Sequence, residues 1–486
     1  MTPRRGASLE RPVCRRRTGR VGWVRYPVTS MLDQVLRRAR EHRKEGERAL
    51  FDLLKIPSVS ALPEHREDCR RAADWLASRL RAMGMDTLVL DVEKDGHPIV
   101  AAEWLGRKGA PTLTIYGHYD VQPPDPLDEW TTPPFEPEVR DGFVYARGAD
   151  DNKGQHMASV LAAEHWFALG GPPINLRFLL EGEEEITGRS LPNFLHKNAD
   201  DLKTDYLLIA DGGFLKEGLP ALCTGLRGML YTEIEVTGPK VDLHSGIFGG
   251  VAPNPLASLA HILAGLKDRE GTVKIPGFYD DVKGASKSEL EEWSELDWLV
   301  RQREESVGSE LVGEPSFSPL ERNWVRPTLE VHGIVGGFQG AGAKTVIPSQ
   351  ATAKVSMRLV PTQRPARIMR GLRRVATELA LPGTRARVHE LSSVPAITLT
   401  PNHPGAEAMR RAFSASFGAT PVLVREGGSI PVANDFQEML GSKMLVTGFG
   451  LPDDALHSPN ERFSLDQYHR ATETVARLFH ELAVLD

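Results

Sequence analysis

The sequence predicts an α/β protein in which a mostly parallel central sheet, flanked by helices, is interrupted by an inserted α+β domain. Short apolar runs at 113–116 and 174–180 alternate with segments of helical periodicity such as 155–169, which is typical of parallel sheets. Acidic residues and histidines directly follow several of these runs, where the ligand sites of such sheets lie. Near Leu226 the pattern changes to longer strands with alternating faces.

The first part of the chain is expected to begin folding at Met31. Apolar residues recur at helical spacing over 31–54 and 68–83, and a short linker from Pro57 to Pro63 joins these two helices. Further on we expect strands at 87–92, 99–104, 113–116, 174–180 and 206–210, a proline-rich loop at 123–137 and a helix at 155–169.

The inserted domain is predicted to span residues 226–395. We expect its strands at 229–237, 328–333 and 352–360, its helices at 255–266 and 364–379, and a helical excursion within the polar stretch 283–314. From Asn402 the chain returns to strand–helix alternation, with helices at 403–417, 431–440 and 465–485. The main domain is therefore expected to comprise 31–225 and 396–486.

Residues 1–30 differ from the rest of the chain. They contain eight arginines and one acid, Glu10, without apolar periodicity, and they lack the apolar centre of a signal peptide. We expect a disordered tail, or an extension upstream of a chain that naturally begins at Met31. A basic arm for a polyanion is the alternative.

Composition narrows the class of protein. The 486 residues are 41% hydrophobic and 26% charged with a net charge of −6, which predicts a soluble protein that binds neither nucleic acid nor an anionic membrane surface. No stretch approaches the roughly 20 apolar residues of a membrane span. Three cysteines, Cys14, Cys69 and Cys223, show no metal-like spacing, so we expect the reducing cytoplasm and no structural disulfides.

His118 and Asp120 follow the apolar run 113–116 and are two residues apart, so both point to the same side of an extended backbone. An imidazole can bind a metal ion, and a nearby carboxylate fixes its tautomer. A lone His-x-Asp at a strand end is more often a solvated turn. The acidic clusters further along the chain favour the metal interpretation.

Four acids occur in the five residues Glu181 to Glu185, directly after the strand expected at 174–180. Like charges beside a buried strand are costly unless a cation is near, although a solvated acidic turn is the ordinary alternative. Asp151 and Asp211 also follow or border apolar segments, and His457 lies before the last helix. Two histidines and three or four carboxylates suit a pair of zinc, cobalt or manganese ions.

Several stretches together resemble the co-catalytic di-metal peptidase family. This family includes cytosolic non-specific dipeptidases, carnosinases, carboxypeptidase G-type enzymes, acylaminoacylases and succinyl-diaminopimelate desuccinylase. The resemblance runs from about Met31 to the C-terminus and rests on 117–123, 147–154, 181–185 and 455–458. Stretches 242–246, 340–348, 358–361 and 425–431 are most similar to the dipeptidase branch, closest to the cytosolic non-specific dipeptidase.

The resemblance implies a role for each residue of the metal centre. One metal would be held by His118 and Asp211, the other by Glu185 and His457, with Asp151 bridging them through the register set by Lys153-Gly154. It also implies that Asp120 orients His118, that Glu184 is the general acid/base, and that a cis peptide follows Asp151. Asn152 stands where the family often has a second Asp.

For the inserted domain, the resemblance implies a lid and a dimerisation surface. His244 would reach the partner subunit's site and stabilise the oxyanion, and Arg358 would bind the substrate's terminal carboxylate, with Thr345, Gly428 and Ser429 nearby. A guanidinium pairs well with a carboxylate, but a surface salt bridge is the alternative for Arg358, as a loop cap is for His244. A substrate role for His389 is doubtful, because this chain lacks the His-Gly-Gly segment of some dipeptidases.

The expected function is therefore that of a homodimeric metallopeptidase with two divalent ions per subunit, zinc before manganese or cobalt. A metal-bridging hydroxide would hydrolyse the amide bond of a dipeptide or short peptide with a free carboxylate. An N-acyl-amino-acid deacylase or a carboxypeptidase on the same scaffold is one alternative. A catalytically silent binding protein is another, but such a protein would be expected to lose Glu184 or a ligand, and this chain keeps them.

Overall fold

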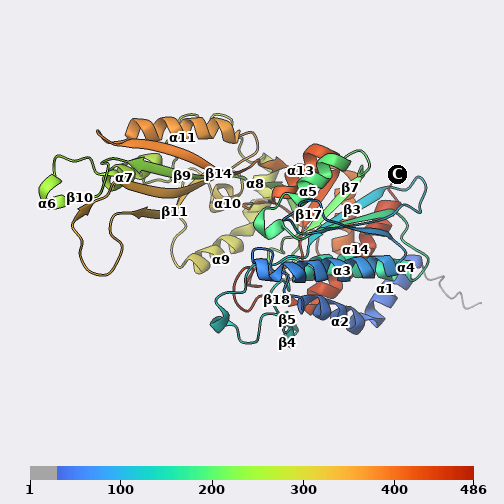
Figure 1. The fold of residues 1–486 in the computed structure, drawn as a ribbon. Coiled ribbons are helices and arrows are strands. Elements are labelled where there is room, and N and C mark those ends of the chain that lie inside the picture. Colours follow the sequence, from blue (N-terminus) through green and yellow to red (C-terminus); the bar gives the residue numbers. More distant parts are fainter. Residues whose placement is uncertain (1–29, 429, 486) are drawn as a thin grey trace, which may run out of the picture.

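The computed structural model describes residues 30–428 and 430–485, so the extension expected at 1–30 lies almost entirely outside the described residues. Figure 1 shows a large α/β domain on the right and a smaller domain, built around a four-stranded sheet, on the left. Among the described helices, none has the combined length and apolar character that crossing a bilayer requires.

A nine-stranded sheet forms the centre of the large domain. Its strands are β1 (Asp86–Leu90), β2 (Ile99–Trp104), β3 (Thr112–His118), β6 (Asn175–Glu181), β7 (Tyr206–Ala210), β8 (Ala221–Leu226), β15 (Ile397–Thr398), β16 (Val422–Glu426) and β17 (Lys443–Thr447). The order is β1-β2-β6-β3-β7-β17-β8-β15, with β16 beside β8. The central strands β6, β3, β7 and β17 run parallel, whereas β1, β2 and β15 pair antiparallel, as does β8 with β17. The expected parallel centre is confirmed.

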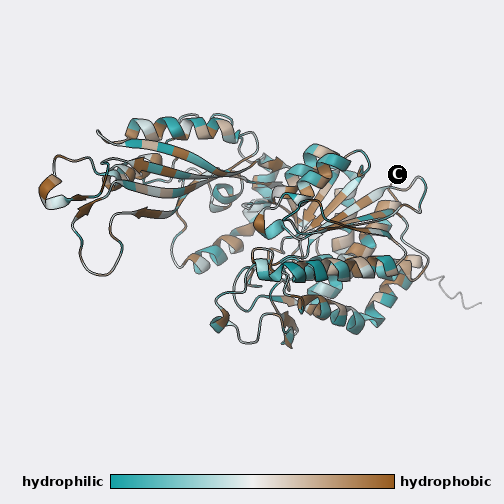
Figure 2. Ribbon diagram, viewed as in Figure 1, coloured by the Kyte–Doolittle hydropathy of each residue, from teal (hydrophilic) through white to brown (hydrophobic). Residues whose placement is uncertain are grey.

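Helices cover both faces of this sheet because its strands are apolar on both sides. On β3, Leu113 and Ile115 join the core cluster of one face, and Tyr116 joins that of the other. The first face is covered by α1 (Met31–Glu41), α2 (Arg43–Leu54), α3 (Arg66–Ala82), α4 (Lys153–Phe167), α12 (Pro404–Phe417) and α14 (Leu465–Ala483). The second is covered by α5 (Ser190–Asn198) and α13 (Pro431–Leu440). Figure 2 shows the apolar residues concentrated in the strands of this sheet.

Several elements differ from the expectation: α5, β8, β16 and β17 were not predicted individually, and many bounds shift by one or more residues. Two of the shifted boundaries concern the first helix and α4. The single helix expected at 31–54 is two helices, because His42 (φ −107°, ψ 23°) leaves the helical conformation and its N–H bonds to the carbonyl of Arg38. Helix α4 begins at Lys153, two residues before the expected Gln155, so it starts directly after the Asp151-Asn152 pair. The chain therefore leaves the site segment straight into a buried helix.

The smaller domain has an antiparallel sheet with the order β11-β13-β9-β14. Its elements are β9 (Gly228–Thr237), β11 (Thr328–Gly336), β13 (Gln350–Leu359), β14 (Arg385–Val394), α7 (Pro255–Leu266) and α11 (Pro365–Leu379). The two helices pack on one face, where Leu230 and Ile234 of β9 are fully buried. At the far end lie β10 (Leu243–His244), α6 (Ser245–Phe248) and β12 (Val346–Ile347), here called the tip (Figure 1).

The helical excursion expected at 283–314 contains α8 (Lys287–Trp293) and α9 (Asp297–Val307), and α10 (Pro319–Trp324) follows it. These helices pack against the large domain, because Trp293 and Trp324 form one apolar cluster with Ala221 and Val424 of the central sheet. The chain thus returns to the large domain inside the range 226–395. The boundaries of the inserted domain stay a proposal.

A small three-stranded sheet brings two distant segments together. It consists of β4 (Glu138–Arg140), β5 (Phe143–Tyr145) and β18 (Arg462–Ser464), and Arg462 pairs with Tyr145. The chain reaches Asp151 shortly after β5, and His457 lies just before β18. Pairing these strands places the two segments side by side at the edge of the central sheet.

Candidate metal centre

Five residues from separate segments meet at the carboxyl end of the parallel strands. His118 ends β3, Asp211 follows β7, and Glu185 lies in the turn after β6. Asp151 precedes α4, and His457 precedes β18. Parallel strands end at a common edge, so these side chains converge as the sequence analysis expected.

The carboxylate of Asp151 lies between the two histidines. Its Oδ1 is 3.0 Å from Nε2 of His118, and its Oδ2 is 2.9 Å from Nε2 of His457. Asp211 Oδ1 lies 3.5 Å from the His118 nitrogen, and Glu185 Oε2 lies 3.4 Å from the His457 nitrogen. The site therefore consists of two histidine–carboxylate groups that share Asp151.

Hydrogen bonds account for only part of these contacts. Nε2 of the fully buried His118 has no hydrogen-bond partner among the described residues, although Asp151 and Asp211 are close. Ligand atoms about 2.0–2.2 Å from a tetrahedral zinc ion would be about 3.3 Å from one another. One ligand atom each of His118, Asp151 and Glu185 lies within 4.8 Å of the others, which is a group that could hold a metal.

The carboxylates change the protonation of the metal-free site. Hydrogen bonds with Asp151 and Glu185 raise the pKa of His457 to about 10. Burial opposes protonation of His118, but the charge of Asp211 and the nearby carboxylates of Asp120 and Asp151 outweigh it and raise that pKa well above its ordinary value. Burial raises the pKa of Glu184 to about 9, and the nearby carboxylates add to the shift. Without metal ions, these side chains would therefore hold protons at neutral pH where cations would otherwise bind.

A second group of polar side chains positions the first. Nδ1 of His118 lies 3.1 Å from the carbonyl oxygen of Asp120 and 3.5 Å from its carboxylate, so the backbone oxygen is the nearer partner and the orienting role of the carboxylate stays a prediction. The same carboxylate accepts hydrogen bonds from Ser60 Oγ (2.7 Å) and from the N–H of Glu185 (3.2 Å). Asp120 thereby contacts one residue of each histidine–carboxylate group.

Two positioning residues were not singled out from the sequence. Gln122 Nε2 donates to Glu185 Oε2 at 2.8 Å. Asn152 Nδ2 donates to Asp211 Oδ1 at 2.8 Å and to the carbonyl of Ala210 at 2.7 Å. Both belong to stretches that carried the resemblance, but no spacing indicated which ligand each would contact. The peptide bond between Asp151 and Asn152 is cis, as the resemblance implies.

The four acids of 181–185 have four different environments. Glu181 accepts a hydrogen bond from the Tyr116 hydroxyl at 2.8 Å. Glu183 accepts bonds from the N–H of His97 (2.6 Å) and from the N–H and hydroxyl of Ser190 (2.9 and 2.8 Å). Protein donors therefore serve two of the four acids, and Glu185 is the acid of this turn that lies beside His457, with Oε2 at 3.4 Å from its Nε2.

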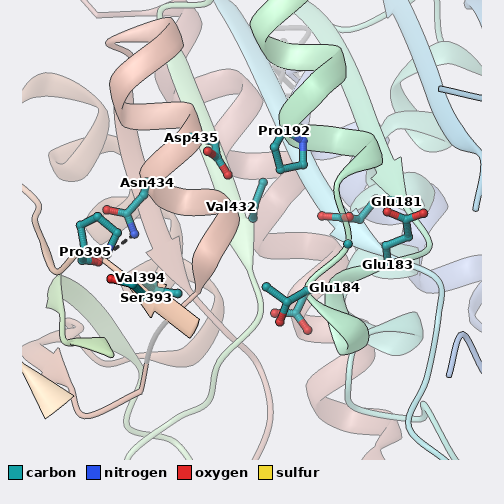
Figure 3. A pocket seen from close by; sticks show the side chains of 12 residues that line it. Glu181, Glu183, Glu184, Pro192, Ser393, Val394, Pro395, Val432, Asn434 and Asp435 are labelled. Carbon is teal, nitrogen blue, oxygen red and sulfur yellow. Dashed lines mark hydrogen bonds between the residues drawn. The ribbon is translucent and has the colours of Figure 1, made fainter. Parts of the chain in front are cut away.

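Glu184 faces two spaces at once. It lines the cavity beside Asp151, Asp211 and His457, and it also lines a second pocket, shown in Figure 3. In that view α13 lies on one side of the pocket and the turn with Glu181 and Glu183 lies on the other. An acid at this position can contact a group bound beside the proposed metal ligands. It can also exchange protons with water in the second pocket.

The cavity beside the metal ligands is suited to a small organic molecule. Its polar lining includes three of the proposed ligands, Asp151, Asp211 and His457, and the half-buried Glu426, which sequence reasoning did not single out; Gly428 also lines it. Its apolar lining includes Cys223, Leu226, Ile430, Val446 and Leu456. Ser429, expected near the substrate, lies outside the described residues.

Arg358 lies near the end of β13, close to where the chain passes from β8 into β9. It pairs with Met229, and its charge, after burial, contributes to lowering the pKa of Arg227 to about 10. Arg227 donates to the carbonyl of Gly427 at 3.0 Å. Arg227 therefore links the surroundings of Arg358 to the residue that precedes Gly428.

His244 and Thr345 are instead found at the tip. His244 pairs with Val346, and the carbonyl of Thr345 accepts the N–H of Ser245 at 3.1 Å. Arg358 is near the opposite end of β13, roughly 25 Å away at about 3.3 Å per residue. Within one chain, these two residues are not brought to the metal ligands. His389 contacts Glu235 at 3.0 Å on the sheet of the smaller domain.

The sequence and the fold both match known peptidases. The model of Peptidase family M20/M25/M40 matches residues 114–481. The Cys-Gly metallodipeptidase dug1 of Schizosaccharomyces pombe is 32% identical over 468 residues, covering 93% of this chain and 98% of that protein. Human carnosine dipeptidase 1 has a TM-score of 0.80 at 30% identity, over 94% of this chain and 99% of its own. An M20 family metallo-carboxypeptidase from Sulfolobus solfataricus has the same TM-score and identity, over 91% and 100%.

Proposed function

The chain belongs to peptidase family M20/M25/M40 and is a metallopeptidase, and from this premise we propose that it cleaves dipeptides or short peptides that carry a free C-terminal carboxylate. The observation that carries the proposal is the position of Asp151, whose two oxygens lie 3.0 and 2.9 Å from the two histidine nitrogens. A shared carboxylate of this kind is how a protein holds two divalent ions close together.

In this proposal each subunit binds two ions, with zinc favoured over manganese or cobalt. His118 and Asp211 would hold one ion, Glu185 and His457 the other, and Asp151 would bridge them. When bound, the ions polarise the scissile carbonyl and lower the pKa of water. The buried Nε2 of His118, which lacks a hydrogen-bond partner among the described residues, supports this assignment.

Glu184 would move the proton. Its carboxylate would take the proton of the attacking water and deliver it to the nitrogen of the leaving amine. Burial gives Glu184 a pKa of about 9 in the metal-free protein, and bound cations would lower that pKa, so the residue could serve first as a base and then as an acid. Its place on the cavity wall beside Asp151 and Asp211 supports this role.

The substrate would be bound at both ends. Arg358 would pair with the terminal carboxylate, helped by Gly428, Ser429 and, from a partner subunit, Thr345. Glu426 on the cavity wall would face the free amine of a dipeptide, which an N-acyl amino acid lacks. This favours a dipeptidase over a deacylase. A carboxypeptidase is the second candidate, because the metallo-carboxypeptidase from Sulfolobus solfataricus resembles this chain as strongly as the human dipeptidase does.

The active unit would be a homodimer formed through the smaller domain. Strand β11 is an edge strand, and its Val331, Ile334 and Val335 are exposed. Around the tip, Ile247 and Val251 are 71% and 80% exposed. Large apolar side chains gathered on one domain support a protein interface there. A partner would then bring its tip, with His244, to the site, where the imidazole would stabilise the oxyanion.

Buried free thiols at Cys69 and Cys223 are consistent with a cytoplasmic location.

Metal analysis combined with a substrate panel tests this proposal. The panel contains several dipeptides, a C-terminally amidated dipeptide, an N-acetyl amino acid and an N-succinyl amino acid, assayed with the wild type and with Glu184→Ala. We expect two metals in both proteins, cleavage of free dipeptides only by the wild type, and a rate loss of about 10²–10⁴-fold in the variant. Cleavage restricted to acyl amino acids would contradict the dipeptidase proposal, and a protein that binds no metal would contradict the site.

A further inference from the structure

Glu461 is a fully buried acid that none of the roles above uses. Its Oε2 accepts hydrogen bonds from the N–H of Gly148 (2.8 Å) and from Nη1 of Arg147 (2.7 Å). Its Oε1 accepts bonds from the N–H groups of Asp150 (3.0 Å) and Asp151 (3.1 Å). One carboxylate therefore accepts four hydrogen bonds from the turn that ends at Asp151.

Glu461 is also joined to the other side of the site through its own backbone. Its carbonyl accepts the N–H of Ala146 at 3.1 Å, next to the pairing of Arg462 with Tyr145. His457 lies only four residues before it. The segment between them contains residues with positive φ at His457 (58°) and Asn460 (62°), so its backbone follows a defined path. Glu461 thereby connects the turn of Asp151 with the loop of His457.

We propose that Glu461 is a positioning residue for the metal centre, setting the distance between Asp151 and His457. The inference deepens the proposed function and rests on its metal site. The physical basis is that four donors, one of them a guanidinium, converge on one charged acceptor, and charge-assisted hydrogen bonds are strong and geometrically restrictive. The bond from the N–H of Asp151 fixes the backbone from which its side chain extends, so losing that bond would let the backbone shift and carry the carboxylate away from the histidines.

A role limited to folding is the alternative, since a buried Arg147–Glu461 pair would also stabilise the chain. The variant Glu461→Gln separates the two. It keeps the shape of the side chain but replaces one oxygen by an NH₂ group, which cannot accept the bonds of the donor pair that it faces, while the remaining oxygen can still serve the other pair. Glu314→Gln is the matched control, because Glu314 forms a two-bond pair with Arg326 (2.7 and 2.8 Å) away from the metal ligands.

The first readout needs no metal. In the metal-free protein, we expect Glu461→Gln to increase hydrogen exchange at the amides of Gly148, Asp150 and Asp151 more than in the core strands, and Glu314→Gln to leave these amides unchanged.

The second readout is a cobalt titration followed by the visible spectrum of the bound ion. We expect Glu461→Gln to weaken cobalt binding by about 10–100-fold and to change the spectrum, as is typical when a positioning partner of a ligand is lost.

Unchanged cobalt affinity and spectrum in Glu461→Gln would overturn the proposal. If this variant does not fold, the wild-type protein decides the question: amides of Gly148, Asp150 and Asp151 that exchange as fast as exposed loops would contradict the contacts to Glu461. A wild type that binds no cobalt, but protects these amides, would instead contradict the metal site and leave the structural contacts intact. The two failures are therefore distinguishable.

Discussion

The position of Asp151 depends on contacts with residues that are distant from it in the sequence. Its two oxygens face different histidines, at 3.0 and 2.9 Å, while its N–H is bound by Glu461 at 3.1 Å. Around it, Gln122 and Asn152 each donate to one further carboxylate, on Glu185 and Asp211. At the scale of single residues, hydrogen-bond donors outside the site therefore fix the orientation of the carboxylates within it.

Metal binding should depend strongly on pH, because protons and metal ions compete for the same atoms. The pKa values of His118 and His457 are raised in the metal-free protein, that of His457 to about 10, so both imidazoles are protonated at pH 7. A metal ligand must lose its proton, and each proton released weakens apparent affinity about tenfold per pH unit of acidification. We therefore expect zinc affinity to rise with pH from 6 to 9.

Calorimetric titration in buffers of different ionisation enthalpy measures this proton release directly. The sign is opposite for folding of the metal-free protein: a raised folded-state pKa adds stability that is complete below the unfolded value and is lost as pH rises, for His457 through about 10. A zinc affinity that stays constant between pH 6 and 9 would contradict the assignment of the histidines as ligands.

At the scale of an element, the turn after β6 contains one glutamate that stabilises the fold, Glu183, next to one that faces the cavities, Glu184. Glu183 holds the start of α5 through Ser190 and fixes the 97–98 segment through the N–H of His97. Glu184, the next residue, faces the cavities, and its pKa of about 9 shows that burial opposes its charge. Neighbouring glutamates in a short 3₁₀ turn point in different directions, so adjacent residues serve different purposes.

We predict that Glu183→Ala destabilises the metal-free protein by about 2–4 kcal/mol, because three buried donors lose their acceptor. Glu184→Ala should change the free energy of unfolding by much less, since it removes a carboxyl group whose burial is unfavourable. Urea unfolding of both variants measures the difference. Equal losses of stability in the two variants would contradict the division of the turn into a structural and a chemical residue.

At the scale of the whole molecule, the proposed function requires more than one chain. The proposed metal ligands lie in the large domain, whereas His244 and Thr345 lie at the tip of the smaller domain, beyond the far end of β13 (Figure 1). Exposed apolar side chains on β11 and around the tip supply a surface through which a symmetric dimer could form.

Mixing two inactive variants tests this arrangement. We expect His244→Ala and Glu184→Ala to be inactive as pure proteins, and their mixture, after subunit exchange, to regain about a quarter of wild-type activity, because half of the dimers would contain one intact site of two. Activity assays on the mixture, with sedimentation to establish the oligomeric state, measure this. A monomeric protein, or a mixture without activity, would contradict the contribution of His244 from a partner.

The fold and the general place of the site could be predicted from the sequence because both depend on local patterns. Strand β7 and helix α7 have the bounds expected from their apolar periodicity. His118 and Asp211 were assigned to strand ends, and parallel strands necessarily bring such ends to a common edge. The α/β class is confirmed by the TM-score of 0.80 with human carnosine dipeptidase 1.

By itself the sequence determined many of the strands and helices, the family, and the residue types that gather at the edge of the sheet, with Glu184 and Glu185 assigned to the site through the resemblance. Only the tertiary structure revealed α5, β14 and β17 as separate elements and showed that Glu181 and Glu183 are bound by protein donors. It also decided that α8 and α10 return to the large domain and that Glu461 joins the two metal loops. The physical reason is that these outcomes depend on side-chain direction and on contacts across about 300 residues, for which the local period of a strand or helix contains no information.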